Sequence, residues 1–200
     1  MAREKETIIT KLEKGRAEFA YKCVAAIIEP KKDKNLFIVL KKALEKFFQK
    51  DIKDGKITID KINNLLENIK DFSKKEYNNI SVTEKKVVEF MIKLKKDYRS
   101  YVKKLPQMIL SNGLGQSMAF VFSKKKEGNA YAFIYQQISE YLNSNNTIRI
   151  SKDKDKDLLE WIISLDSHNY RYATEEVLAF LNWLRRFAEG MIEVSEEEND

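Results

Sequence analysis

Four cations at helical spacing form the pattern in this sequence that most clearly suggests a chemistry. Lys95, Lys96, Arg99 and Lys103 follow one another with Asp97 as the only acid among them. On a helix, these four side chains fall within an arc of about 100°. A row of ammonium and guanidinium groups suits phosphate contacts, which position a nucleic-acid strand without reading its sequence. The alternative is a solvated helix face that binds nothing.

Three further cations belong to the candidate nucleic-acid-binding set. Lys104 follows the row directly, and Arg185 and Arg186 form a pair near the end of the chain. The two arginines are either phosphate ligands or partners of carboxylates on the same helix. The candidate carboxylates are Glu175, Glu176 and Glu189. Tyr98 and Tyr101 fall on the core side of the helix, so no aromatic stacking motif is predicted.

Catalytic and metal-binding side chains are scarce. The chain has one cysteine, Cys23, and one histidine, His168. These numbers exclude a disulfide framework and a Cys/His zinc site. We interpret Cys23 as a small buried hydrophobe and His168 as a solvated residue in a connector. The sequence therefore predicts no catalytic residue, no metal site and no cofactor.

An aspartate series resembles the opening of a calcium-binding EF-hand. Asp153, Asp155 and Asp157 alternate with lysines. An EF-hand loop needs glycine at its sixth position and glutamate at its twelfth, where this chain has Leu158 and Ser164. Calcium binding is therefore not expected.

A glycine pair resembles half of a dinucleotide-binding fingerprint. Gly113-Leu114-Gly115 has Met118 at the third glycine position, and no predicted strand precedes it. We interpret residues 112–116 as a turn between helices, with a positive φ at Gly113 and with Gln116 bonded to the turn backbone.

Composition and periodicity predict an all-α fold. Charged residues make up 34% of the chain, and glycine and proline together occupy only eight positions. We expect a single-domain helical bundle of about seven to eight helices over residues 1–192, with 30–82 as an elaboration within it. Ser81 and Glu84 have capping-box spacing, and Pro106 is expected to break the helix that they begin. The expected helical segments, some of them short, are 7–28, 36–49, 59–72, 82–104, 106–111, 116–122, 129–143, 158–165 and 170–192.

Charge is distributed unevenly along the chain. The net charge is +6, but residues 193–200 carry five acids and no base. The rest therefore has 37 bases against 26 acids, which predicts a polyanionic partner for the body and a disordered acidic tail. No apolar run is long enough to span a membrane, so we expect a cytoplasmic protein without a membrane partner.

Three blocks of the sequence resemble a known family. They are RAEFAYKCV (residues 16–24), YRSYVKKLPQMILSNGLGQSMAFVF (98–122) and YRYATEEVLAFLNWLRRFAEGMI (170–192). Together they are similar to the small subunit of the type III-B CRISPR effector, the Cmr complex. The chain departs from that family between residues 30 and 82, where it is longer.

The resemblance implies a function without catalysis. Small subunits of this family are helical proteins that stack head to tail as a short filament inside the RNA-guided effector. They lie beside the backbone subunits that hold the guide RNA and next to the large signature subunit, and they line the path of the target RNA. The partners implied are these Cmr subunits, further copies of the chain, the target RNA and the guide ribonucleoprotein, with a monomer in isolation. From the residues alone, a helical protein–protein scaffold without nucleic-acid contact remains the alternative.

Overall fold

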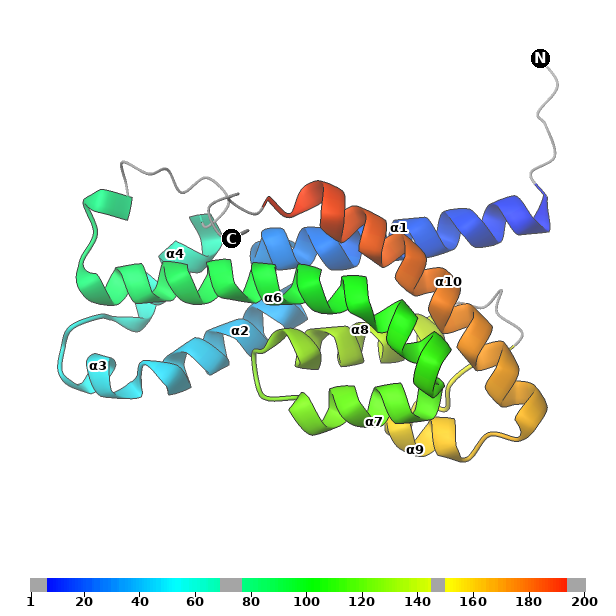
Figure 1. Ribbon diagram of the computed structural model, residues 1–200. Helices are drawn as coiled ribbons and strands as arrows, with labels where there is room; N and C mark the ends of the chain where they lie inside the picture. The colour runs from blue at the N-terminus through cyan, green and yellow to red at the C-terminus, as the bar shows by residue number, and fades with distance from the viewer. Residues whose placement is uncertain (1–6, 69–76, 145–149, 194–200) are drawn as a thin grey trace, which may run out of the picture.

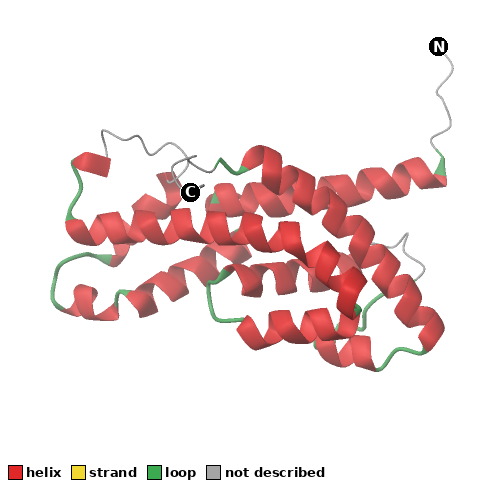
Figure 2. Ribbon diagram, in the orientation of Figure 1, coloured by secondary structure: helices red, strands yellow, loops and turns green. Residues whose placement is uncertain are grey.

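Every regular element in the described part of the chain is helical. The computed structural model describes residues 7–68, 77–144 and 150–193, and Figure 2 shows no strand in these ranges. The prediction of an all-α fold is confirmed. The elements are α1 (Ile8–Ile28), the 3-10 helix η1 (Pro30–Lys32), α2 (Lys34–Phe47), α3 (Gln49–Lys53), α4 (Ile59–Asn68), α6 (Val82–Asn112), α7 (Leu114–Lys124), α8 (Ala130–Ser144), α9 (Leu158–Ile163) and α10 (Ser167–Met191).

The long helix α6 organises the packing. It contacts α4 near its start and then α7, α8 and α10, while α1 packs along α10. Figure 1 shows α6 running through the middle of the molecule, with α1 and α10 on one side and α7 and α8 on the other. One buried apolar cluster extends from α1 to α10 and includes the fully buried rings of Tyr98, Phe133 and Phe180. Helices α2 and α4 pack on each other and join the same cluster through Leu40, Leu44 and Leu66.

The start of α6 is fixed by the predicted capping box. Ser81 Oγ accepts a hydrogen bond from the Glu84 backbone N–H at 3.3 Å, and Glu84 Oε2 accepts one from the Ser81 N–H at 2.7 Å. The Glu84 carboxylate also pairs with Lys61 Nζ on α4 at 3.1 Å. The cap therefore sets the first turn of α6 and ties α4 to it.

The expected break at Pro106 is wrong. Helix α6 continues through the proline to Asn112, and Figure 1 shows it bending toward α7 near this end. Proline removes a single hydrogen bond and distorts the preceding turn, which bends a helix when packing holds both sides. Here Leu105, Pro106 and Ile109 are all buried, so tertiary packing outweighs the local cost.

A single glycine joins α6 to α7. Gly113 has φ 81° and ψ 162°. The positive φ is confirmed, although this ψ lies outside the left-handed helical region and in one that is essentially restricted to glycine. The turn is held by Ser117 Oγ, which donates to the Gly113 carbonyl at 2.8 Å, and by Tyr170, whose hydroxyl accepts from the Gly115 N–H at 2.9 Å. These residues, rather than the predicted Gln116, provide the observed hydrogen bonds.

We expect Gly113→Ala to lower the free energy of unfolding by about 1–3 kcal/mol, because alanine is strained at this φ and ψ. The added Cβ would also lie 3.3 Å from the Tyr170 hydroxyl oxygen. Urea unfolding followed by circular dichroism measures the change. Gly15→Ala is the control, because Gly15 lies inside α1 with nothing within 4 Å of the new Cβ and should be slightly stabilised. Equal effects of the two substitutions would contradict the assignment.

Helix α10 begins earlier than predicted, which places His168 in its first turn. The Asp166 side chain caps the helix by accepting a hydrogen bond from the Asn169 N–H at 2.8 Å. His168 is exposed, as expected, but it lies on the helix with its ring edge-on to Tyr172. The connector assignment is wrong because the Asp166 cap starts the helix three residues before Tyr170, the expected first residue.

Two predictions fall at the edges of the described residues. The end of the helix expected over 59–72 and all of the acidic tail except Glu193 lie outside them. Within the described ranges, none of the helices combines the length and the apolar character needed to cross a membrane.

Candidate nucleic-acid interface

The four predicted cations lie on one side of α6, and we call Lys95, Lys96, Arg99 and Lys103 the α6 ridge. Lys96 and Lys103 are exposed, whereas Lys95 and Arg99 are half-buried. Lys103 Nζ lies 3.7 Å from Glu189 Oε1 of α10 and stays 67% exposed. An ion pair this exposed and this long contributes little stability. Lys103 is therefore free to exchange that carboxylate for a phosphate.

Lys95 is the member of the ridge least suited to bind a phosphate. Burial holds the pKa of Lys95 below its usual value, while the nearby Glu29 carboxylate opposes that shift. Desolvation of this kind disfavours the charged ammonium. Helical spacing places Lys95 on the ridge side of α6, but packing of neighbouring groups partly buries its side chain.

Arg99 of the α6 ridge and Arg185 of α10 are both half-buried. In each, the Nε atom is buried and has no hydrogen-bond partner within the described chain. The arginine stems therefore pack against the protein up to the Nε atom. Arg185 lies one helical turn before Glu189, the residue that contacts Lys103. This spacing places Arg185 on the same face of α10 as the carboxylate that contacts the ridge.

Arg186 and Lys104 point away from this group. The Arg186 guanidinium lies over the Trp183 ring, 5.8 Å from its centroid, in a hollow shared with Glu13 of α1. Lys104 lies about 100° around α6 from Lys103. It lines a different hollow, with Met108 and with Phe120 of α7. The seven candidate cations therefore do not form one continuous surface.

A buried ionic network that the sequence did not predict joins α1 to α10. Arg16 donates to both carboxylate oxygens of Glu176, from Nε at 2.8 Å and from Nη2 at 2.7 Å. Tyr141 of α8 donates to the same carboxylate. Arg16 also pairs with Glu13, which accepts a hydrogen bond from Trp183 Nε1 at 2.8 Å. A bidentate arginine–carboxylate pair of this kind fixes the geometry of three helices at once.

The network favours the charged forms of Arg16 and Glu13. Hydrogen bonding to Glu176 raises the pKa of Arg16, and the Trp183 hydrogen bond lowers the pKa of Glu13, with a further contribution from Arg16. Glu176 thus pairs with Arg16 of α1, whereas the sequence analysis considered it only as one possible partner of Arg185 or Arg186. The only sequence signal was that Arg16 lies off the apolar stripe of its helix.

The remaining candidates for chemistry have structural roles. Cys23 is buried, as expected, and burial raises the pKa of its thiol. At the aspartate series, the buried ammonium of Lys152 donates to the Asp153 carbonyl at 2.6 Å. Asp157 caps α9 by accepting from the Leu159 N–H at 3.0 Å. Within the described ranges, no three acid, histidine or cysteine side chains lie close enough to hold a metal ion.

Comparison with known proteins gives this geometry a family context. The model of the family described as CRISPR-associated protein (Cas_Cmr5) matches residues 69–191, which is more than half of the chain. This chain belongs to the Cmr5 family. A Thermus thermophilus protein named "CRISPR system Cmr subunit Cmr5" is 31% identical over 97 residues, covering 48% of this chain and 76% of that protein. The resemblance to the small subunit of the type III-B Cmr complex is thereby confirmed.

The Cmr5 match coincides with the part of the chain that carries the candidate cations. Residues 69–191 include the α6 ridge, Lys104, Arg185 and Arg186. Helices α1 and α2 lie outside the matched range. The Arg16–Glu176 pair therefore connects α1, outside the match, to α10, inside it.

Proposed function

We propose that this chain is a non-catalytic small subunit of a type III-B Cmr complex that contacts the backbone of the target RNA through the α6 ridge. The observation that carries the proposal is the exposure of Lys96 and Lys103 on the longest helix of the family-matched region. Arg99 and Arg185 add two guanidinium groups beside them. We further propose that the chain is cytoplasmic and monomeric in dilute solution, and that it stacks head to tail with copies of itself inside the complex.

The residue types on the ridge support backbone contact rather than sequence reading. Lysine binds phosphate as a point charge and arginine binds it as a planar fork. Contacts of this kind position a strand and are insensitive to its sequence. In an RNA-guided complex, pairing with the guide supplies specificity, so a subunit of this kind needs only charge and shape.

The acids that the fold brings together support a role without catalysis. Arg16 pairs with both Glu13 and Glu176. Glu13 also accepts a hydrogen bond from Trp183, and Glu176 accepts one from Tyr141. A carboxylate held in this way is poorly placed to act as a general base. We therefore assign these groups to stability.

A protein–protein scaffold is the second candidate, and one observation favours it. Ile92 lies among the ridge cations and is 56% exposed, so this side of α6 offers an apolar contact as well as charge. In that case the ridge would face a neighbouring subunit instead of RNA.

Reconstitution of the Cmr complex with and without this chain separates the two functions. We expect omission to weaken binding of target RNA by a similar factor for unrelated guide–target pairs, because phosphate contacts carry no base information. The purified chain alone should leave RNA intact with or without Mg²⁺. A complex that assembles without the chain and binds target RNA equally well would contradict the proposal, as would RNA cleavage by the chain that a point mutation abolishes.

A further inference from the structure

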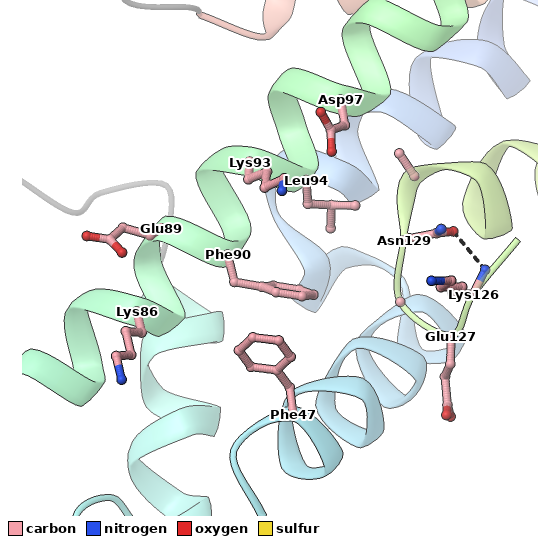
Figure 3. Close-up of a pocket in the computed structure, with 12 residues that line it drawn as sticks. Phe47, Lys86, Glu89, Phe90, Lys93, Leu94, Asp97, Lys126, Glu127 and Asn129 are labelled. Atoms are coloured by element: carbon pink, nitrogen blue, oxygen red, sulfur yellow. Dashed lines mark hydrogen bonds between the residues drawn. The ribbon is translucent and has the colours of Figure 1, made fainter. Parts of the chain in front are cut away.

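A cleft with an aromatic wall lies beside α6, on a side that the function proposed above does not use. Its volume is about 640 Å³, and it is bounded by the end of α2, the first half of α6 and the loop before α8. Phe47 and Phe90 contribute their rings, whose centroids are 5.9 Å apart (Figure 3). Phe47 is 68% exposed, a large value for phenylalanine. The cleft therefore presents an uncovered aromatic face to solvent.

The charges around this cleft favour an anion. Lys86, Lys93 and Lys126 line it, and within the described part of the chain no ion-pair partner is found for any of them. Within the described part of the chain, three ammonium groups without an ion-pair partner therefore surround an apolar wall.

Two of the three acids at the cleft are engaged elsewhere. Glu127 pairs with Lys46 at 3.6 Å, and Glu89 accepts a hydrogen bond from the Tyr77 hydroxyl at 2.7 Å. Figure 3 shows both carboxylates pointing away from the two phenyl rings. Asp97 is the third acid, so cations outnumber the available carboxylates in the cleft.

The cleft adjoins the α6 ridge. Lys93 precedes Lys96 by three residues, a spacing that makes them neighbours on the helix surface. A strand whose phosphates follow the ridge can therefore continue over Lys93 to the mouth of the cleft without leaving α6.

We propose that this cleft binds an unpaired nucleobase of a single-stranded RNA, stacked on Phe47, with the flanking phosphates on Lys93 and Lys126. This inference rests on the proposed contact with RNA and adds a base-binding site to it. A nucleotide combines a flat apolar ring with a negative phosphate, which matches an exposed phenyl ring rimmed by ammonium groups. Stacking of this kind accepts any base because every base has a π face.

The test compares two RNA probes with the full-length chain at low salt. The probes are a twelve-nucleotide oligoadenylate and an abasic oligomer with the same number of phosphates. We expect Phe47→Ala to weaken binding of oligoadenylate about fivefold or more and to leave binding of the abasic oligomer unchanged. Lys93→Gln should weaken both probes equally, because it removes a phosphate contact.

Leu110→Ala is the matched control, since Leu110 is a 67% exposed apolar residue on α6 that does not line the cleft. It should change neither affinity, and both alanine variants should keep the wild-type melting temperature within a few degrees.

Four results would overturn the inference. They are no detectable binding of oligoadenylate by the wild-type chain, no effect of Phe47→Ala, an equal effect on both probes, and loss of assembly with other Cmr subunits while RNA binding is kept. The last result would make the cleft a protein-docking site. Neutralising the α6 ridge should weaken both probes. If that variant binds normally while Phe47→Ala shows the selective loss, the ridge proposal fails and the cleft assignment stands.

Discussion

Replacing Glu176 with alanine is expected to lower the free energy of unfolding by about 2–3 kcal/mol. The substitution leaves the Arg16 guanidinium in a nearly buried position with Glu13 as the remaining carboxylate partner among the described residues, and it removes a hydrogen-bond acceptor of Tyr141. Full loss of a buried partner costs more, and the contact with Glu13 reduces the effect here. Chemical unfolding of the purified chain measures it.

Glu175→Ala is the control for this effect, because Glu175 is the exposed neighbour of Glu176 on the same helix. It should change stability by less than about 0.5 kcal/mol. Glu176→Gln keeps the shape and part of the hydrogen bonding, so its stability should fall between that of the wild type and that of the alanine variant. Similar stabilities for the two alanine variants would show that the network does not hold α1 to α10.

Helix positions could be predicted from local sequence where a cap or a clear period defined them. Ser81 and Glu84 predicted the start of α6, and the structure has the capping box there. The break expected at Pro106 is absent because burial of the surrounding residues outweighs the local preference of proline, and a single sequence does not show that burial. Helix type depends mostly on neighbouring residues, whereas continuity through a proline depends on distant packing.

The ridge could be predicted only in outline. The period of the helix placed Lys96, Arg99 and Lys103 on one side, as the structure has them. The burial of Lys95 and the contact between Lys103 and Glu189 depend on how other helices pack around α6. Helical spacing does not contain that information.

Contacts between distant segments could not be predicted at all. Arg16 and Glu176 are 160 residues apart, and nothing local to either residue indicates the other. Phe47 and Phe48 both read as apolar residues of one helix, yet Phe48 is buried in the core and Phe47 faces the cleft. Which of two adjacent rings is covered is decided by where α2 ends relative to α6.

Neutralising the α6 ridge is expected to have the largest effect on RNA binding. We predict that Lys96→Gln, Arg99→Gln and Lys103→Gln together weaken binding of target RNA by the assembled complex at least about tenfold near 0.1 M salt. Glutamine is preferred to glutamate because a carboxylate at position 103 would face Glu189. The matched control replaces three other lysines with glutamine, namely Lys42, Lys50 and Lys53. These lysines are exposed and lie on α2 and α3, outside the family-matched region.

The salt dependence of that binding tests the central claim most directly. Affinities of the wild-type, ridge and control complexes are measured between 50 and 200 mM salt for two unrelated guide–target pairs. If the ridge contacts phosphates, its neutralisation reduces the slope of log affinity against log salt by about 2–3, equally for both targets, while the control leaves the slope unchanged. An unchanged slope, or a loss confined to one target sequence, would contradict the assignment of the α6 ridge to the RNA backbone.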